Sequence, residues 1–264
     1  VPNTSATAAS SGSDLNGMAT ADACAKIKRR LQNFAAEHWQ TSLDQVSFVS
    51  GKVRIGSDEI SFDELVALAY RARVSLSATG FYATPKIDWD KTQAKGRPFL
   101  YFAYGAAVTE VAIDTLTGEN RLLRVDILHD VGKSLNPAID FGQIEGGFVQ
   151  GVGWLTTEEL WWDDAGHLQT HAPSTYKIPT LSDRAPDMRI NLWAPGRNIE
   201  QTIHRSKAVG EPPLMLGISA FLALSDAVAA SGDYQHYPKL DAPATPERIL
   251  KAVQNVASAH KEAV

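Results

Sequence analysis

The residue in this sequence best suited to chemistry is a glutamate that precedes two prolines. Glu211 lies in the run Ser206-Lys207-Ala208-Val209-Gly210-Glu211-Pro212-Pro213-Leu214. Proline disfavours helical geometry in the residue before it, so we expect the backbone of Glu211 to be extended. Gly210 has no side chain, which allows another group to approach its backbone closely. Apolar neighbours predict a buried carboxylate suited to general-base chemistry, and the plainer alternative is a surface loop with Glu211 in solvent.

Other patterns with catalytic or metal-binding potential have the wrong spacing. Gly132-Lys133-Ser134 resembles the end of a phosphate-binding loop, but the glycine required five residues earlier is replaced by Ile127. The glycines after residue 137 never form the dinucleotide-binding pattern that follows a strand. His167 and His171 fall in a segment expected to be a strand, where side chains four apart lie ~13 Å from each other. That separation argues against a shared metal ion.

The composition is that of a globular protein and argues against several other classes of protein. The 264 residues include 25 Lys and Arg against 30 Asp and Glu, a net charge of −5, and 44% of them are hydrophobic. These are globular proportions, and the acidic excess argues against a nucleic-acid-coating protein. Cys24 is the single cysteine, which excludes an internal disulfide and an iron–sulfur cluster held by this chain alone. No apolar run approaches the ~20 residues of a membrane span, and because the sequence begins at Val1 we expect a piece of a longer protein.

The first hundred residues are expected to form two helices and a hairpin. Asp14 can cap a helix with apolar residues at helical spacing. Alternating apolar residues over 46–55, interrupted by Ser50-Gly51, predict the hairpin. Ser61 and Glu64 have the spacing of a capping box, which predicts the start of the second helix.

The remaining residues predict a mixture of strands and helices. A strand–turn–strand pattern covers 99–128, and Asn136-Pro137 is a favourable helix start. The helix that follows contains five glycines, which indicates close approach by another backbone or a ligand. Further strands are expected at 160–170 and 188–193, and a last apolar helix at 214–230. Since strands and helices do not alternate regularly, the predicted class is α+β, with hairpins and mixed sheets packed with helices.

Five stretches, taken together, carry a family resemblance over nearly the whole chain. They resemble motifs of the molybdenum hydroxylases, the xanthine dehydrogenase/xanthine oxidase family, and occur in the family's order. The stretches are Pro2-Asn3-Thr4-Ser5 with Thr7-Ala8-Ala9-Ser10, Gly80-Phe81-Tyr82-Ala83-Thr84-Pro85-Lys86, Asn136-Pro137-Ala138-Ile139-Asp140 with Gly142-Gln143-Ile144-Glu145-Gly146, Pro173-Ser174-Thr175-Tyr176-Lys177-Ile178-Pro179, and Ser206 to Leu214. The resemblance implies that residues 1–264 are the C-terminal part of the molybdenum-cofactor-binding subunit, with any internal boundary left open.

The resemblance also implies roles for the matching residues. Glu211 corresponds to the general base that activates the attacking, water-derived oxygen. Gln143 corresponds to a glutamine that hydrogen-bonds the molybdopterin, near a helix start where free N–H groups favour an anion. Gly210 would let the backbone approach the ligands of the metal. The cofactor loop would comprise Thr7, Ala8, Ala9, Ser10 and Ser11, with the backbone of Ala9 nearest the molybdenum. Gly12 stands where animal members have serine, which leaves one cofactor hydrogen bond unaccounted for.

The activity implied is that of a xanthine dehydrogenase, which converts hypoxanthine to xanthine and xanthine to urate. A molybdenum–molybdopterin cofactor would lie in the pocket of this chain, with iron–sulfur clusters and FAD elsewhere in the complex and NAD as electron acceptor. The expected partners are the N-terminal half of the molybdenum subunit and an iron–sulfur/FAD subunit. The expected assembly is a cytoplasmic dimer of heteromers that acts on a purine and binds neither nucleic acid nor membrane.

Two other functions remain open. One is an aldehyde or N-heterocycle hydroxylase of the same family, although Gly80 to Lys86 and Leu214 to Ser219 are more similar to xanthine dehydrogenases. The other is a non-catalytic scaffold that keeps the fold for assembly. The presence of Glu211, Gln143 and the loop from Thr7 to Ser11 counts against a scaffold, which needs none of them.

Overall fold

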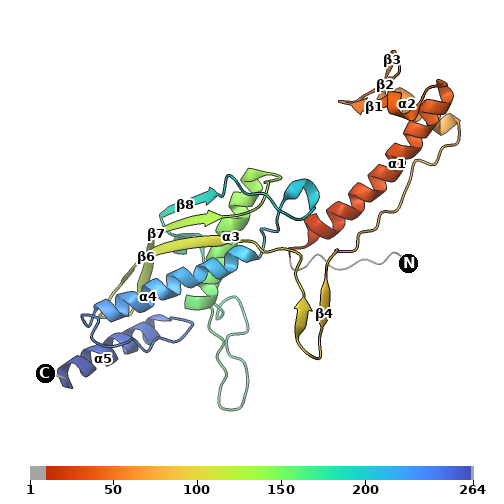
Figure 1. Cartoon of the computed structure of the whole chain (residues 1–264). Coiled ribbons are helices and arrows are strands. Elements are labelled where there is room, and N and C mark those ends of the chain that lie inside the picture. Colours follow the sequence, from red (N-terminus) through yellow and green to blue (C-terminus); the bar gives the residue numbers. More distant parts are fainter. Residues whose placement is uncertain (1–9, 263–264) are drawn as a thin grey trace. The chain divides into compact units, whose positions relative to one another are not determined.

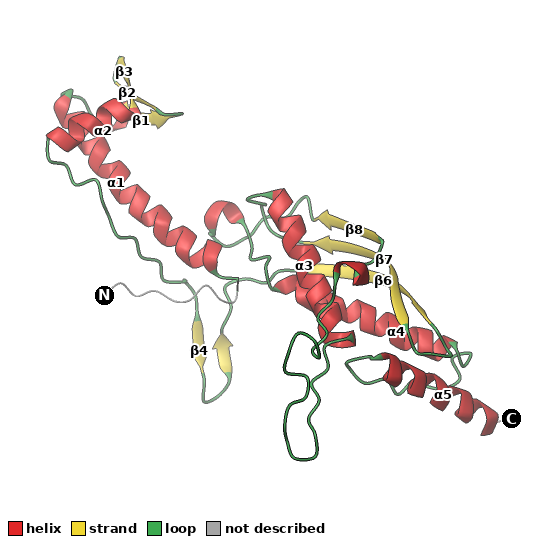
Figure 2. Ribbon diagram, turned by 180° about the vertical axis from the view of Figure 1, so that it is seen from behind, coloured by secondary structure: helices red, strands yellow, loops and turns green. Residues whose placement is uncertain are grey.

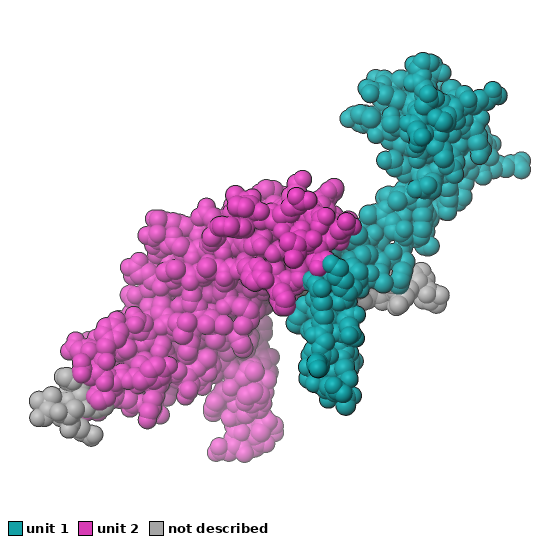
Figure 3. All heavy atoms as spheres, in the orientation of Figure 1, with its two compact units in different colours: residues 1–100 teal, residues 101–264 magenta. Residues whose placement is uncertain are grey.

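The chain divides into two compact units, residues 1–100 and residues 101–264 (Figure 3). The computed structural model describes residues 10–262. Helices occur together with two three-stranded sheets and one two-stranded sheet in this described part. The predicted α+β class is therefore confirmed.

The first unit contains a long helix, a short helix and two small sheets (Figure 1). Its core is formed by residues such as Leu31, Ala35, Val53 and Leu65, contributed by both helices and by the β1–β2 hairpin. Strands β1, β2 and β3 pair antiparallel in that order, and β4 and β5 form a separate hairpin. In chain order the elements are η1 (Gly12–Asn16), α1 (Gly17–His38), η2 (Leu43–Gln45), β1 (Val46–Val49), β2 (Lys52–Ile55), β3 (Asp58–Ser61), α2 (Phe62–Arg71), β4 (Asp88–Asp90) and β5 (Lys95–Arg97).

Local sequence signals explain much of the first unit. Ser50 and Gly51 have φ values of 49° and 77°, and two positive φ values are what a two-residue hairpin turn requires. The hydroxyl of Ser61 accepts a hydrogen bond from the Glu64 N–H at 3.1 Å and caps α2 as predicted. The prediction that Asp14 caps the first helix is wrong, because Asp14 lies inside the π-helical turn η1 and α1 begins at residue 17.

The second unit is built on a three-stranded sheet with helices packed against it (Figure 1 and Figure 2). β6 (Gly105–Ile113) and β7 (Asn120–His129) form the predicted antiparallel pair, and β7 pairs in parallel with β8 (Asp187–Leu192). Helix α3 (Pro137–Thr156) connects these two parallel strands. The resulting β7–α3–β8 crossover brings the carboxyl ends of β7 and β8 to the same edge of the sheet.

Two clusters of apolar side chains hold the second unit together. Buried residues of β7 pack against Ile144 and Phe148 of α3 and Ala220 of α4 (Ile218–Ala230). A second cluster joins α4 to α5 (Pro246–Glu262), with partly buried residues of β6 against it. The described part of this unit also contains the 3₁₀ segments η3 (Leu181–Asp183), η4 (Ile203–Arg205) and η5 (Pro212–Gly217).

The helix predicted over 214–230 is found as two consecutive segments, η5 and α4. The prediction that no apolar run approaches the length of a membrane span is wrong for Pro212–Ala230, whose 19 residues have a mean hydropathy of 1.7 and could cross a membrane by length and composition. Leu224 and Val228 are fully buried in the cluster with α5, whereas Met215 and Leu222 are 56% and 60% exposed. Core packing therefore accounts for only part of the apolar composition of this stretch.

Two expectations for the later part of the chain are wrong or incomplete. The strand expected over 160–170 is reduced to an isolated antiparallel bridge between Trp162 and Leu168 around the turn at Gly166. Helix α5 is an additional element, although its start has a helix signature. The Arg248 N–H donates to the Thr245 hydroxyl at 3.4 Å, and Pro246 is the first helical residue.

Candidate active site

Helix α3 provides the surface on which the candidate site is built. Asn136 caps the helix through its side-chain oxygen, which accepts from the Ile139 N–H at 3.5 Å, and Pro137 is the first helical residue. Ile144 and Phe148 anchor the helix in the core. These apolar residues hold one face of α3 against the core, which leaves glycines of the helix to contact other parts of the chain.

Two glycines of α3 contact the segment that carries Glu211. A Cβ atom added at Gly147 would lie 3.1 Å from Pro213 Cβ and 3.5 Å from the Gly210 carbonyl oxygen. At Gly151 it would lie only 2.1 Å from the Leu214 carbonyl oxygen. Glycine is therefore required at residue 151 and favoured at 147, and close backbone approach explains part of the glycine content of the helix.

Gln143 lies one helical turn before Gly147, on the same face of α3. Four residues of helix span about 6 Å along the axis, so Gln143 lies one turn from the part of α3 against which Gly210 packs. The side chain of Gln143 is exposed, and a Cβ added at Gly142 or Gly146 would meet nothing within 4 Å. In this part of α3 the exposed side-chain amide of Gln143 therefore lies beside two glycines with open space around their backbone.

The structure corrects one detail of the expectation for Gln143. It is the seventh residue of α3, so its own N–H falls within the intrahelical ladder rather than among the free groups of the first turn. Any polar contact from this residue must come from its side-chain amide. The amide offers two N–H donors and one oxygen acceptor.

Glu211 has a different backbone and exposure from those predicted. Its φ and ψ angles are −101° and −37°, which is helical rather than extended, and its side chain is exposed rather than buried. The Leu214 N–H donates to the Glu211 carbonyl at 3.0 Å and closes the first 3₁₀ turn of η5. This bond and the packing of Pro213 on Gly147 override the local preference of a residue before proline.

The turn that leads into this segment is strained and held by hydrogen bonds. His204 and Arg205 have φ values of 49° and 66°, a left-handed conformation that non-glycine residues rarely adopt. The Arg205 carbonyl accepts from the Lys133 N–H at 2.9 Å and from the Asn198 N–H at 3.0 Å. Loops after β7 and after β8 therefore meet at this turn.

Gly132 allows these two loops to come together. Residues 132 and 206 form an isolated antiparallel bridge, and Gly132 has a φ of 63°. A Cβ at this position would lie 2.5 Å from the Arg205 carbonyl oxygen. The Gly132-Lys133-Ser134 run, rejected above as a phosphate loop, thus has a structural role beside the candidate site.

His129, the last residue of β7, is a buried histidine at this edge. It is 1% exposed, and its Nδ1 atom has no hydrogen-bond partner among the residues that the structure describes. Burial lowers the pKa of its imidazole below the usual range, and the nearby Asp130 carboxylate opposes that effect only in part. We therefore expect His129 to be neutral in the folded protein.

The predicted cofactor loop belongs to a different part of the chain. Thr7, Ala8 and Ala9 lie outside the described residues, so the prediction that Ala9 lies nearest the metal has no structural counterpart. Ser10 and Ser11 belong to the first unit, where Ser10 has a φ of 52° and the Ser11 carbonyl accepts from the Leu15 N–H at 2.8 Å. The structure thus has Gln143 on α3 and Gly210 in a segment that packs on the same helix one turn further along, with Glu211 next in sequence, and it has the two serines in the other unit.

The donors near Gln143 fit a polar, anionic cofactor better than a bare metal ion. The described residues contain no group of three or more His, Cys, Asp or Glu side chains that could hold a metal. A molybdenum ion here would depend on ligands that its own cofactor supplies. The exposed Gln143 amide and the open backbone at Gly142 and Gly146 both suit such a group.

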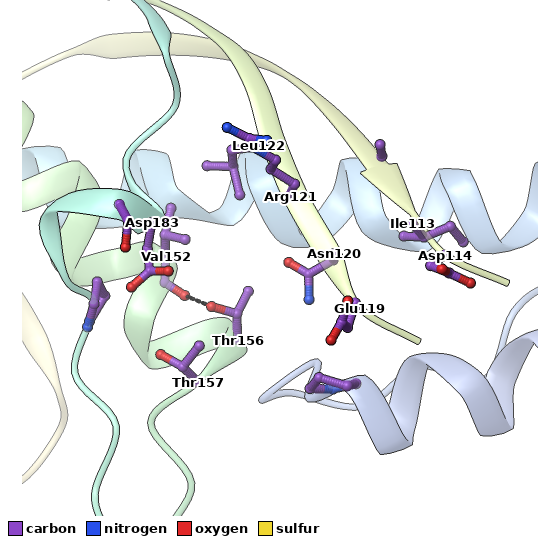
Figure 4. A pocket seen from close by; sticks show the side chains of 14 residues that line it. Ile113, Asp114, Glu119, Asn120, Arg121, Leu122, Val152, Thr156, Thr157 and Asp183 are labelled. Carbon is purple, nitrogen blue, oxygen red and sulfur yellow. Dashed lines mark hydrogen bonds between the residues drawn. The ribbon is translucent and has the colours of Figure 1, made fainter. Parts of the chain in front are cut away.

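The second unit also contains a cavity of about 580 Å³ at the other end of α3 (Figure 4). Val152, Thr156 and Thr157 line it on the helix side, and Arg121 and Asp183 are among its polar residues. The Thr156 hydroxyl donates to the Val152 carbonyl at 2.7 Å. None of the predicted site residues lines this cavity, and no sequence motif indicates it.

Comparisons with known proteins show the family to which the chain belongs. Residues 1–185 match the family model described as the molybdopterin cofactor-binding domain. The chain is 45% identical over 263 residues to a xanthine dehydrogenase of Oryza sativa subsp. japonica and 46% identical over 258 residues to the xanthine dehydrogenase/oxidase of Mus musculus. Each match covers 96% of this chain but only 18% of the relative.

A solved structure with a similar fold is quinoline 2-oxidoreductase from Pseudomonas putida 86. The TM-score is 0.75 at 26% identity, and the match covers 93% of this chain and 30% of that chain. The family model, the sequence identity and the fold agree with one another. The chain therefore belongs to the xanthine dehydrogenase family and corresponds to part of its molybdopterin cofactor-binding region.

Proposed function

We propose that this chain is part of a xanthine dehydrogenase, which oxidises hypoxanthine and xanthine to urate with oxygen derived from water. The identity of 45–46% to two such enzymes over 96% of the chain supports this substrate class. The observation that carries the proposal is structural. Gly210 packs against Gly147 of α3, one helical turn beyond Gln143, and Glu211 is the next residue of that segment.

In this proposal the chain supplies the base and part of the pterin pocket. When bound, the molybdenum cofactor supplies the two-electron oxidation and the oxygen that enters the purine. The Glu211 carboxylate would accept the proton that this oxygen loses, and its side chain is exposed in the described part of the chain. The Gln143 amide would hold the pterin, and Gly210 would admit the cofactor close to the backbone.

We also propose that the rest of the molybdenum subunit covers much of this chain. The chain spans about a fifth of the length of the curated relatives that it matches. Large apolar side chains are exposed in the second unit, among them Leu181 at 89%, Ile199 at 89% and Tyr237 at 90%. Several such residues in solvent indicate surfaces that pack against further protein. The N-terminal half of the subunit is the proposed partner.

Electron transfer would require further groups beyond this chain. Iron–sulfur clusters and FAD on other parts of the complex, and NAD as final acceptor, are proposed from the family resemblance. The single cysteine, Cys24, cannot by itself hold a cluster, which supports their location elsewhere. A cytoplasmic dimer of heteromers is the proposed assembly.

The test is to purify the intact complex that contains this chain and to measure molybdenum per chain together with xanthine-dependent NAD reduction. Stoichiometric molybdenum with turnover is the expected result. Molybdenum without xanthine turnover would contradict the purine assignment. A complex without molybdenum would favour a scaffold that keeps the fold for assembly.

A second candidate function has a specific observation in its favour. The fold match to quinoline 2-oxidoreductase, at 26% identity, supports hydroxylation of another N-heterocycle. Turnover of quinoline or an aromatic aldehyde, without turnover of xanthine, would favour this candidate. Competition between xanthine and quinoline in one assay would rank the two substrates directly.

A further inference from the structure

The segment that carries Glu211 begins at a buried ion pair. Lys207 Nζ lies 2.6 Å from Asp130 Oδ2, and the two side chains are 8% and 15% exposed. By comparison, the pair formed by Arg189 and Asp187 on β8 has side chains 53% and 43% exposed. Exposed pairs contribute little because solvent screens them, whereas a buried pair cannot lose one partner without leaving an uncompensated charge.

The geometry around the pair is fixed on both sides. Asp130 uses its other carboxylate oxygen to accept the Gly132 N–H at 2.8 Å. The Lys207 N–H donates to the Val131 carbonyl at 2.8 Å, and Lys207 Nζ lies 5.0 Å from the centre of the Tyr104 ring. The ammonium therefore has a defined position, rather than the mobility of a surface lysine.

Only three residues separate Lys207 from Glu211, and they are held as well. The Ala208 N–H donates to the Tyr101 hydroxyl at 2.8 Å. Gly210 lies against Gly147 of α3, where an added Cβ would come within 3.5 Å of its carbonyl oxygen. The ion pair thus fixes the start of a short span whose end is fixed by packing on α3, and Glu211 follows directly.

We propose that Lys207 and Asp130 are positioning residues for the Glu211 carboxylate. This inference rests on the proposed function of Glu211 as the general base. The ion pair links the end of β7 to the segment after η4, so the carboxylate takes its position from the sheet. A displacement of about 1 Å at a reacting group can lower the rate by roughly 10²-fold. Loss of the pair should therefore affect the rate even though neither residue reaches the reacting atoms.

The experiment compares Lys207→Met, Asp130→Asn and the double variant in the intact enzyme, with kcat normalised to molybdenum content. The single variants should lower kcat by roughly 10- to 10²-fold at little change in KM. The double variant leaves no unpaired charge, and the amide oxygen introduced by Asp130→Asn can still accept the Gly132 N–H. We therefore expect it to fold, so that it can test the proposal if a single variant does not fold. Arg189→Met, which removes an exposed pair of the same sheet, is the matched control and should keep wild-type kcat.

A double-mutant cycle that combines Lys207→Met with Glu211→Ala separates a positioning effect from a general structural effect. In that background Lys207→Met should cause no further loss, because the group that it positions is absent. An equal loss in both backgrounds would overturn the positioning role, and so would wild-type kcat in both Lys207→Met and the double variant. Wild-type turnover by Glu211→Ala alone would instead overturn the proposed base, independently of the result at Lys207.

Hydrogen exchange gives a readout that does not depend on turnover. Lys207→Met should speed exchange of the amides at positions 207 and 208, which donate to the Val131 carbonyl and the Tyr101 hydroxyl, while the β6–β7 ladder keeps its protection. Unchanged exchange at both amides would contradict the inference. Faster exchange throughout β6 and β7 would also contradict it, since that pattern would indicate loss of the fold.

Discussion

Glu211 combines an accessible side chain with a constrained backbone. Its carbonyl closes a 3₁₀ turn, and the residues on both sides of it are packed or hydrogen-bonded. A residue held in this way loses little conformational freedom when a cofactor and substrate bind, because its backbone is already ordered. An accessible carboxylate on an ordered backbone is well suited to proton transfer.

Glu211→Gln should separate proton transfer from binding. The amide has nearly the same size but cannot act as the base, so turnover should fall by roughly 10²–10⁴-fold while molybdenum content stays constant. Steady-state kinetics and metal analysis of the intact enzyme check both values. Glu247→Gln, in the exposed first turn of α5, is a control of the same chemistry and should have wild-type turnover. Full activity of the Glu211→Gln enzyme is the outcome that excludes Glu211 as base.

Gln143→Ala should act on cofactor retention rather than on proton transfer. If its amide holds the pterin, the variant should contain less molybdenum per chain, and the kcat of its loaded fraction should change less than its metal content. Gln150→Ala removes another exposed glutamine from the same helix, about 10 Å further along its axis, and should leave molybdenum content unchanged. Equal metal content in the two variants would count against a role for Gln143.

At the level of elements, the glycines of α3 have two different environments. Gly151 lies against the Leu214 carbonyl, whereas Gly142 has open space around it. Gly151→Ala should therefore lower stability by about 1–3 kcal/mol through overpacking. Gly142→Ala should raise stability by up to about 1 kcal/mol, because alanine is the better helix former.

The two alanine variants are best compared by thermal unfolding of the cofactor-free protein, so that ligand binding does not enter the comparison. Opposite shifts in the apparent midpoint are expected. A stabilising effect at residue 151 would show that the helix and η5 are not packed as closely as their backbones indicate. A large loss at residue 142 would indicate a neighbour for this glycine that the described residues do not include.

The elements that follow local signals could be predicted from the sequence. Ser50-Gly51 allows a tight hairpin turn, and Asn136-Pro137 starts a helix whatever the rest of the chain does. The parallel pairing of β7 with β8 could not be predicted in the same way, because α3 and a long loop separate the two strands. Helix α5 shows the opposite situation. Thr245-Pro246 is a local signal for a helix start, but this helix is not among the elements predicted from the sequence.

The motif resemblance predicts the residues of the candidate site, but no sequence pattern predicts its geometry. Gln143, Gly210 and Glu211 stay predictions from that resemblance, whereas the close neighbour indicated by the glycines of α3 is found in the structure. The helical backbone and exposure of Glu211 arise from packing on Gly147, which no local pattern encodes. The Lys207–Asp130 pair joins residues 77 positions apart, so its existence depends on the tertiary fold.

For the molecule as a whole, buried His129 links stability to pH. Its pKa is lowered in the folded state by burial, so the unfolded chain binds a proton more readily. Above the ordinary histidine pKa of about 6.5, the imidazole is neutral in the folded and the unfolded state, so its burial carries no protonation cost. As the pH falls from there towards the lower pKa of the folded state, the unfolded chain binds the proton first and the free energy of unfolding decreases. The stabilisation is therefore complete near neutral pH and lost on acidification.

His129→Leu should reduce this loss, since leucine fills a similar volume without a titrating group. Denaturant unfolding at neutral pH and at a pH below about 6 should show a smaller difference for the variant than for the wild type. Identical pH dependence in His129→Leu and the wild type would contradict the assignment of this linkage to His129.

The length of α3 sets how far its two ends are from each other. Thirteen positions, or about 20 Å of helix, lie between Gln143 and Thr156, where the chain enters the long loop that returns towards β8. That loop comes back to the first half of the helix, because its Arg184 forms an ion pair with Glu145, two residues after Gln143. A substitution in the loop can therefore reach the surface around Gln143 through this ion pair, without acting along the length of the helix.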